Sequence, residues 1–480
     1  MFKNLKFSKN FIYLFFLVSL LCFFLIDFTE EADIWFLLSH GRYVINNGIP
    51  YTDVLSMHEG FNFIMQQWLS STIFYVIYKY LGKISFYIFI FILNFIITFL
   101  IYKLCLVISN NKKFSSCFIS IITMLLLQRA YIVPRPQMFT FIILIVLLIM
   151  LELYSSKRKK YINYMPILSI LLINFHASMW PMIFIFCMPY VAELILKKDK
   201  DVIRLIIIML ISLIVGFINP YGLGAMTYSI KSYGHEYICA VVGEMRSFDL
   251  LDINYVSYWG YFTLLIFFIS NLIILLNSKK NNIKISHLLL FYGTFFMSLL
   301  GLRNISLFII GTVPFLVKYF EFQDIDKFNL NKEWIINYSI IGLIFISAFS
   351  FSIINKNYEF KHAAEPVLEY LNKNVDKNIK LYTEYSFGSL FEYYGYKPYL
   401  DSRAEVFIEK MNNKEDILKE YIIFNLDETS RDKFIEKYDF DYYVISNDYF
   451  DVIEYLLNHK EYNFELILSV DRISLVKRVN

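Results

Sequence analysis

Ionisable side chains recur beside the ends of long apolar runs in this sequence, in types that could bind an anion and move a proton. Arginine suits phosphate because its planar guanidinium offers paired donors. A carboxylate or an imidazole can serve in general acid–base catalysis. If these groups share one side of a membrane, they predict a site for an anionic headgroup and an acid–base step. The residues concerned are Glu31, Asp33, Arg129, Arg135, His176 and Arg303, with the polar amide of Asn174 beside His176.

Further polar residues stand in the segments that flank the apolar runs. Asp53, His58 and Glu244 could help to bind a divalent ion, although no compact ligand spacing indicates a metal site. Asp401 and Arg403 follow a predicted strand, where α/β folds often place binding residues, but a local salt bridge that fixes a turn also explains them. His176 is explained equally well as a helix-packing residue, and arginines at helix ends often extend to lipid headgroups.

The elements that must position these residues are membrane spans. The chain has 480 residues, of which 57% are hydrophobic, and a soluble fold of this size could not bury so much apolar side chain. About eleven apolar runs are long enough to cross the hydrocarbon core, which is roughly 30 Å thick. They lie at about 11–27, 84–106, 114–132, 137–155, 161–177, 180–196, 203–218, 256–276, 285–301, 303–320 and 334–354.

Lysine and arginine clusters between the runs predict the orientation, because short cationic loops stay in the cytoplasm. With eleven spans and a cytoplasmic N-terminus, six such clusters fall inside, provided that residues 61–82 do not cross. This aromatic stretch contains Gln66, Gln67 and Trp68, which suit a helix lying in the interface. The rival interpretation is an ordinary span, favoured by Lys79 and Lys83, and it would invert every later loop.

Charge, cysteine content and the N-terminus exclude other classes of protein. A net charge of +3 is too small to indicate a nucleic-acid partner. The five cysteines lie mostly within or beside apolar runs without regular spacing, which argues against a disulfide framework. Residues 1–27 lack an A-x-A-like cleavage site, so we expect an uncleaved first span.

Composition changes after about residue 355, where long apolar runs stop and charges become frequent. We therefore expect a transmembrane domain at 1–355, with a large outer loop at 28–83, and a soluble α/β domain at 356–480. The predicted strands are 380–383, 397–400, 441–446, 464–469 and 472–477, and the predicted helices are 364–375, one containing Gly388, 404–425 and 430–438. An odd number of spans places this domain outside the cytoplasm.

The order of motifs resembles the GT-C superfamily of polytopic glycosyltransferases, which use polyprenyl-phosphate-linked sugars. An acidic residue follows the first span, and a long first outer loop with interfacial helices comes next. The matching strings resemble a bacterial membrane-protein family related to this superfamily and run nearly from end to end. They are Asp33-Ile34-Trp35, Gly41-Arg42-Tyr43, Gly48-Ile49-Pro50, Asp53, Ser56, Trp68-Leu69, Arg135-Pro136-Gln137, Asn174, His176, Asn219-Pro220-Tyr221-Gly222 and Tyr399 to Glu405.

The resemblance implies an inverting type of sugar transfer from a polyprenyl-phosphate donor to a cell-surface glycan, lipid or protein. The catalytic base would be Asp33, with Glu31 and Glu30 as alternatives, and His176 would donate a proton or hydrogen bond. Cations would stabilise the leaving phosphate; we expect no obligatory cofactor, although a divalent cation is compatible with the site. Donor-phosphate ligands would be Arg129, Arg135, Asn174 and Arg303, and acceptor or supporting residues would be Asp53, His58, Glu244, Asp401 and Arg403.

Two other classes of function fit parts of the sequence. A transporter or flippase of a lipid-linked or anionic solute usually has repeated halves and ionisable residues near mid-membrane. Neither is evident here, since the polar residues lie at span ends. A non-catalytic envelope-assembly protein with the same architecture is hardly distinguishable from the enzyme by sequence. In each case we expect the cytoplasmic membrane of a bacterium, since the composition suggests an AT-rich bacterial genome.

Overall fold

The computed structural model describes residues 32–131, 133–248, 258–277, 283–319, 360–470 and 472–479. The chain divides into two compact units, each built from segments that are far apart in the sequence. Unit 1 contains Met1–Asp27, Ile84–Met226 and Gly243–Lys356, and unit 2 contains Phe28–Lys83, Thr227–Val242 and Asn357–Asn480. The expected spans at 11–27 and 334–354 lie outside the described residues, as do Glu30 and Glu31.

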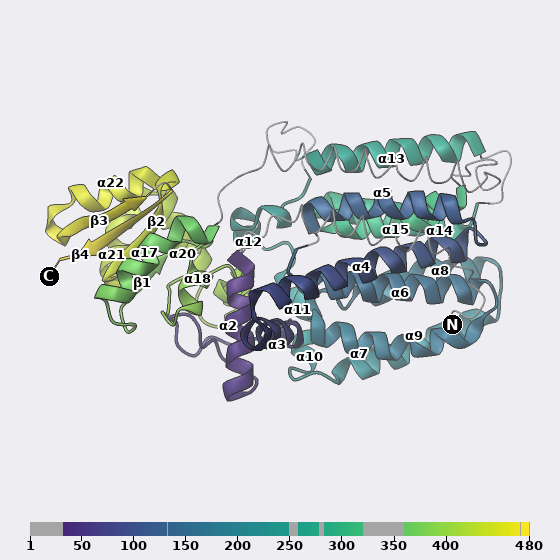
Figure 1. Ribbon diagram of the computed structural model, residues 1–480, viewed down its shortest axis with the longest axis horizontal. Helices are drawn as coiled ribbons and strands as arrows, with labels where there is room; N and C mark the ends of the chain where they lie inside the picture. The colour runs from purple at the N-terminus through teal and green to yellow at the C-terminus, as the bar shows by residue number, and fades with distance from the viewer. Residues whose placement is uncertain are drawn as a thin grey trace. The chain divides into compact units, whose positions relative to one another are not determined.

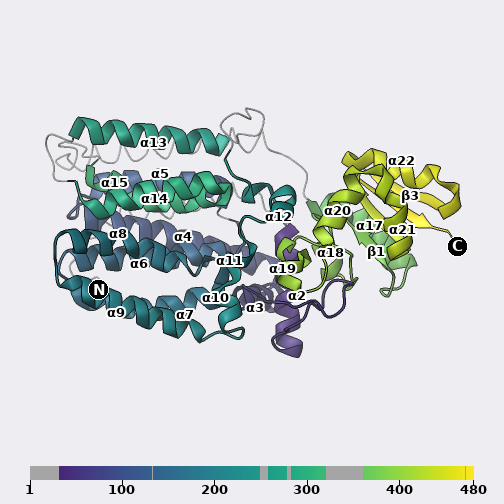
Figure 2. The same ribbon diagram turned by 180° about the vertical axis from the view of Figure 1, so that it is seen from behind.

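Unit 1 consists of helices that run side by side along one direction (Figure 1 and Figure 2). The long ones are α4 (Gly82–Ile108), α5 (Lys113–Tyr131), α6 (Gln137–Ser155), α7 (Met165–Phe175), α8 (Met182–Leu196), α9 (Asp201–Ile214), α13 (Tyr258–Asn277), α14 (Ile285–Leu300) and α15 (Ile305–Tyr319). Short helical segments are η2 (Lys159–Tyr164), η3 (Ala177–Met179), η4 (Val215–Phe217), α10 (Leu223–Met226), η5 (Gly243–Met245) and η6 (Leu302–Asn304).

Among the described residues, four helical stretches are long and apolar enough to cross a membrane. They are Trp68–Ile108, Gln137–Ser155, Ala177–Leu196 and Leu302–Tyr319. They overlap the predicted spans at 84–106, 137–155, 180–196 and 303–320, and the first also includes residues 68–82, which were expected not to cross. Shorter apolar helices at Ser115–Leu127, Thr263–Leu276 and Ile285–Leu300 overlap three more. The protein is therefore mainly helical, and several of its helices have the length and composition of membrane spans.

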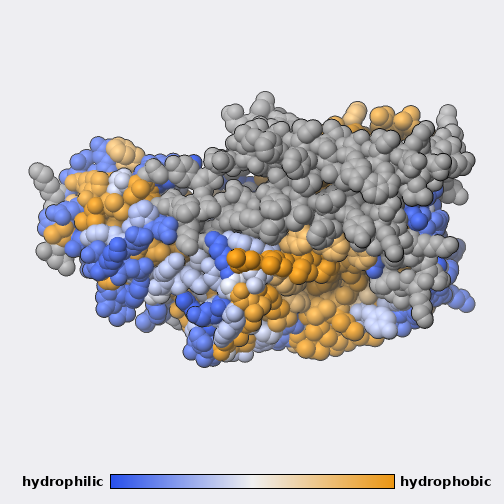
Figure 3. All heavy atoms as spheres, in the orientation of Figure 1, coloured by the Kyte–Doolittle hydropathy of each residue, from blue (hydrophilic) through white to orange (hydrophobic). Residues whose placement is uncertain are grey.

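Large apolar side chains face outward from unit 1. On α4, Ile84, Ile88 and Ile92 are 75%, 50% and 46% exposed, and their spacing of four residues places them on one stripe of the helix. On α9, most of the outward positions are also aliphatic, among them Ile203, Leu210 and Ile214. Figure 3 shows the apolar surface over α4 and α7. A continuous surface of this kind is unfavourable in water and suits contact with lipid.

The two ends of the unit 1 helices carry different polar groups. After α6 and α8, Lys157 donates to Asp199 at 2.5 Å and to Asp201 at 3.0 Å, so these two connections share an end. At the same end, Glu152 accepts from His287 Nε2 at 2.7 Å and from Lys284 at 2.9 Å. At the start of α6, by contrast, Gln137 donates to Ser306 at the start of α15. Arg135 and Arg303 precede these two helices, so they lie at the end opposite to the lysine-rich loops.

Unit 2 combines helices with a four-stranded sheet of order β1-β2-β4-β3, in which β1 pairs with β2 in parallel and the other pairs are antiparallel. Its strands are β1 (Leu381–Thr383), β2 (Tyr442–Ser446), β3 (Phe464–Val470) and β4 (Ile473–Arg478). Its α-helices are α2 (Ala32–Asn47), α3 (Trp68–Val76), α11 (Tyr228–Ser232), α12 (Glu236–Val241), α17 (Phe360–Asn374), α18 (Gly388–Tyr393), α19 (Glu409–Asn412), α20 (Ile417–Leu426), α21 (Arg431–Tyr438) and α22 (Phe450–Asn458). Single turns are η1 (Ile77–Leu81), η8 (Ala404–Phe407), η9 (Glu428–Ser430), η10 (Asn447–Tyr449) and η11 (Lys460–Tyr462).

The predicted strands at 441–446, 464–469 and 472–477 coincide with β2, β3 and β4, whose buried positions are apolar or aromatic except for Ser446 and Ser474. The strand predicted at 397–400 is reduced to a single bridge between Leu381 and Pro398, because proline has no N–H to donate to a ladder. The predicted helix at 404–425 is broken into η8, α19 and α20. Ile408 is extended between the first two segments, and Asn413 adopts a left-handed conformation that ends α19.

The helix predicted over 61–82 begins only at Trp68. Residues 61–67 are not helical, and Asn62 forms an isolated bridge with Thr52. Ser71 packs closely against α2 at Gly41. From Ile77 the helix loosens into a π turn and is interrupted at Gly82, whose φ of +84° is a conformation that favours glycine. This interruption separates α3 and η1 from the long apolar helix α4.

Candidate functional site

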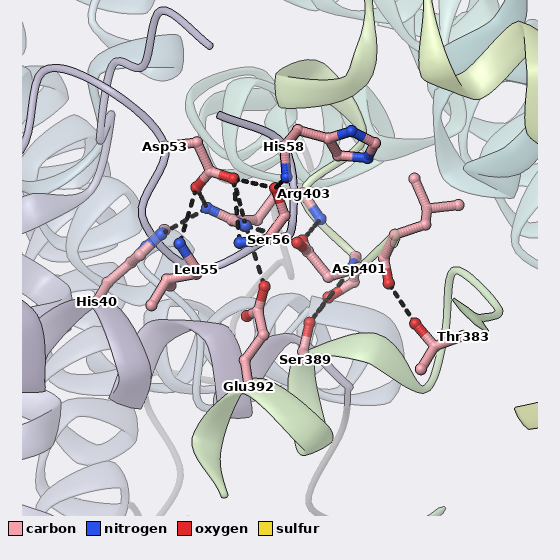
Figure 4. A network of polar contacts seen from close by, with 12 residues as sticks. His40, Asp53, Leu55, Ser56, His58, Thr383, Ser389, Glu392, Asp401 and Arg403 are labelled. Atoms are coloured by element: carbon pink, nitrogen blue, oxygen red, sulfur yellow. Dashed lines mark hydrogen bonds and ion pairs between the residues drawn. The ribbon is translucent and has the colours of Figure 1, made fainter. Parts of the chain in front are cut away.

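A buried arginine forms the centre of a polar cluster in unit 2 (Figure 4). Arg403 follows the bridge segment at Pro398 and donates from Nη1 to Asp53 at 2.6 Å and from Nη2 to Glu392 at 3.0 Å. It also binds Asp401 through two donors, Nε at 2.8 Å and Nη2 at 2.6 Å. The side chains of all four residues are at most 3% exposed. The salt bridge that the sequence suggested between Asp401 and Arg403 is therefore present, as part of a larger cluster.

Each carboxylate in this cluster comes from a different local structure. Asp53 lies in the loop after α2, where its carboxylate also accepts from the backbone N–H groups of Leu55 and Ser56. Glu392 lies on α18, and Asp401 precedes Arg403 in the loop that reaches η8. The cluster therefore joins two segments that are 350 residues apart in the sequence.

Arg403 changes the pKa values of the surrounding acids to different extents. Burial alone would raise the pKa of Asp53, but the charge and hydrogen bonds of Arg403 lower that pKa to about 2. Burial and the neighbouring Asp401 raise the pKa of Glu392 well above its ordinary value, despite the attraction of Arg403. The raised pKa favours the uncharged form of Glu392, which reduces the cost of burying three acids around one guanidinium.

Two histidines near the cluster have lowered pKa values, which favours their uncharged forms. Nε2 of His40, on α2, lies 3.4 Å from Arg403 Nη1, and burial followed by the charge of Arg403 keeps the pKa of His40 well below its ordinary value. His58 donates from Nε2 to the Tyr399 carbonyl at 2.8 Å and stacks on Phe61. Burial lowers the pKa of His58 as well. The ring of His58 is thus hydrogen-bonded to the backbone of the bridge segment.

Asp33 stands in the first turn of α2 and is half-buried. A carboxylate in this position interacts favourably with the positive end of the helix dipole. Trp35, two residues later, packs its ring against Tyr393 at 4.9 Å and is almost fully buried. Asp33 is the one of the three predicted candidate bases that falls within the described part of the chain, since Glu30 and Glu31 lie outside it.

The second cluster lies in unit 1 and joins Arg135, Glu244 and Arg303. Arg303 donates from Nη2 to Glu244 Oε1 at 2.8 Å, and Arg135 approaches the same carboxylate at 3.4 and 3.5 Å. Burial would raise the pKa of Glu244, but Arg303 and Arg135 lower that pKa to about 2. Counted over these three side chains alone, two guanidinium groups and one ionised carboxylate give a net charge of +1. The three side chains are 24–34% exposed, so solvent or a ligand can reach them.

Asn174 lies in the last turn of α7, and His176 follows the end of this helix, near the cluster. His176 Nδ1 lies 2.9 Å from Thr140 Oγ1 on α6, and the charges of Arg303 and Glu244 act on its ring. Asn174 donates from its amide to the carbonyls of Ile170 and Ile218, both at 2.8 Å. The structure thus brings Arg135, His176, Glu244 and Arg303 together. The side chain of Arg129 lies outside the described residues, although its backbone belongs to α5.

Within the described ranges, no group of three or more His, Cys, Asp and Glu side chains is placed to hold a metal ion. Arg135 and Arg303 of the unit 1 cluster could hold a phosphate, because a guanidinium pairs well with phosphate oxygens.

His40 and Glu392 were not among the predicted site residues. Glu392 did carry a signal, because an acid within the run Leu390-Phe391-Glu392-Tyr393-Tyr394 needs a buried partner. His40 lies in the apolar helix α2, where an imidazole can have a packing role as easily as a functional one. Its contact with Arg403 depends on tertiary structure and has no local signal.

No protein-family model matches this chain, and no curated protein sequence matches it.

Proposed function

We propose that this chain is a GT-C-like membrane glycosyltransferase that moves a sugar from a polyprenyl-phosphate donor to an extracytoplasmic acceptor. The proposal includes about eleven spans, a cytoplasmic N-terminus and an extracytoplasmic α/β domain in the C-terminal part of unit 2. The observation that carries it is the cluster of Arg135, Glu244 and Arg303, a net cation at the end of unit 1 opposite to the lysine-rich loops.

The sidedness of this cluster supports a lipid-linked donor. Lysine-rich loops stay in the cytoplasm, so the opposite end of the helices faces outward. Nucleotide sugars are absent there, and a polyprenyl phosphate delivers the activated sugar instead. Its charged group needs cations at the membrane surface, and its tail needs an apolar surface such as the outward aliphatic faces of α4 and α9.

In the proposed reaction, the carboxylate of Asp33 takes the proton of an acceptor hydroxyl. The acceptor oxygen attacks the anomeric carbon while the bond from that carbon to the phosphate oxygen breaks, so the configuration inverts. The electron pair leaves with the polyprenyl phosphate, whose growing negative charge Arg135 and Arg303 stabilise. His176 supports the phosphate as a hydrogen-bond partner. In this scheme the two arginines supply the positive charge, and no redox cofactor takes part.

Two measurements on the full-length protein in nanodiscs test this proposal. Arg303→Gln should weaken binding of labelled polyprenyl-phosphate sugar by about 10- to 100-fold, since a hydrogen bond to a charged group contributes about 1.5–3 kcal/mol. Lys157→Gln is the matched control, because this exposed cation lies at the other end of the same unit. It should leave the affinity unchanged.

The second measurement separates binding from chemistry. Asp33→Asn should bind the donor with wild-type affinity and lose sugar transfer. Binding without transfer in the wild-type protein would favour the non-catalytic assembly role. Equal affinity of Arg303→Gln and wild type would remove the unit 1 cluster from the donor site and refute the proposal.

A further inference from the structure

Residues 388–403 hold helix α2 at three points along its length. Near its start, Trp35 packs against the rings of Tyr393 and Tyr394, at 4.9 and 6.3 Å. Near its end, Arg42 donates to the carbonyls of Tyr393 and Glu392, at 2.8 and 3.1 Å. These contacts lie seven residues apart, which is about two turns of helix. The orientation of α2 is therefore determined by a segment that lies some 350 residues later in the chain.

Arg403 supplies the third and most buried point. It contacts His40 on α2, Asp53 in the loop that follows, and Glu392, whose carbonyl also accepts from Arg42. A guanidinium can make all these contacts because its five donors have a fixed planar geometry, which an ammonium group lacks. Loss of the contact with Asp53 would leave a buried carboxylate without its compensating charge.

We propose that Arg403 is a positioning residue that holds α2, and with it Asp33, in the orientation needed for sugar transfer. The inference rests on the proposed function, in which Asp33 is the base. It assigns to the C-terminal segment a task beyond acceptor recognition: residues 388–403 form part of the support of the catalytic helix. Arg403 itself touches no reacting group in this scheme.

Arg431 provides a matched control within the same unit. It is equally buried, and it donates to Asp451 and to the carbonyls of Phe424 and Asn425, so it joins α20, α21 and α22. None of its observed hydrogen bonds reaches α2. Arg403→Lys and Arg431→Lys therefore make the same chemical change at two buried arginines, and only the first change weakens the support of α2.

The test compares kcat, the KM for the donor and hydrogen exchange in full-length variants. Arg403→Lys should lower kcat at least tenfold, keep the KM for the donor within twofold, and speed amide exchange in α2. Arg431→Lys should retain wild-type kcat and wild-type exchange in α2. A purely structural role for Arg403 would lower the fraction of active protein equally in both variants, without a selective effect on α2.

A second variant keeps the test decisive if Arg403→Lys does not fold. Arg42→Met removes two hydrogen bonds between α2 and residues 392–393 from a half-buried position and buries no charge. It should lower kcat and speed exchange in α2 in the same way. Wild-type kcat and exchange in Arg42→Met, or equal losses in Arg431→Lys, would overturn the inference. If the wild-type protein transfers no sugar, the proposed function fails, and exchange in α2 alone decides whether Arg403 holds this helix.

Discussion

Glu384 should make unit 2 less stable as the pH rises through the neutral range. This acid follows β1, is only 4% exposed, and accepts a hydrogen bond from the backbone N–H of Ser446 at the end of β2. Burial raises its pKa to about 8, against the lowering effect of that hydrogen bond. Glu384 is therefore protonated in the fold at pH 7, whereas it is ionised in the unfolded chain.

The sign and size of the effect follow from this pKa. The stabilisation is fully present below pH 4.5, where both states are protonated, and is lost progressively as the pH rises to about 8. Over this interval of about 3.5 pH units, each worth about 1.36 kcal/mol, the free energy of unfolding should fall by about 5 kcal/mol at most. Above pH 8 this contribution should be constant.

Glu384→Gln tests the reasoning, because glutamine retains the acceptor for Ser446 and cannot ionise. Hydrogen exchange in β2, corrected for the intrinsic pH dependence of amide exchange, should show a loss of protection between pH 5 and pH 9 in the wild type. This loss should be much smaller in the variant. Glu461→Gln, at an exposed position, is the control and should behave as wild type. An identical pH dependence in wild type and Glu384→Gln would refute the argument.

Two further predictions concern packing and sidedness. A methyl group at Gly41 would lie 2.2 Å from the Ser71 carbonyl, so Gly41→Ala should destabilise the packing of α2 on α3 by about 1–3 kcal/mol in thermal unfolding. Gly293→Ala on α14 meets no atom within 4 Å and should be neutral or stabilising; an equal loss there would contradict the explanation. In a chain whose native cysteines are replaced by alanine, Lys433→Cys should react with an impermeant maleimide in intact cells, and Arg158→Cys only after permeabilisation. Labelling of both sites in intact cells would exclude the proposed orientation.

Local patterns predicted those elements whose residues determine them locally. The strands β2, β3 and β4 follow from short apolar and aromatic runs, and the predicted spans at 137–155 and 180–196 overlap helices long and apolar enough to cross a membrane. The break at Asn413 within the predicted helix at 404–425 was not foreseen, because left-handed asparagine is a feature of the particular turn. Pro398 argued against a full strand, because proline has no N–H to donate. The strand was predicted nevertheless from the apolar residues around it.

The sequence predicted many of the residues of the candidate site, but few of the contacts between them. Asp401 and Arg403 were paired correctly because only Ser402 lies between them, whereas the ion pair of Asp53 with the same guanidinium was not predicted. Arg135, Glu244 and Arg303 were each placed at span ends, but their contact depends on how η5 and η6 return to the start of α6. Such long-range pairs leave no periodic signal in a single sequence.

The separation between Asp53 and Arg403 has a consequence for biosynthesis. At about 5–20 residues per second, a ribosome needs roughly 20–70 s to add the 350 residues between them. During that time the first segment of unit 2 has been made, while the strands and the guanidinium that complete its core have not. The loop that contains Asp53 therefore remains unfolded or bound to chaperones until the last quarter of the chain has been synthesised. A chain truncated before residue 388 would leave Asp53 without the guanidinium that compensates its charge, so early termination should leave the first segment of unit 2 without its folded core.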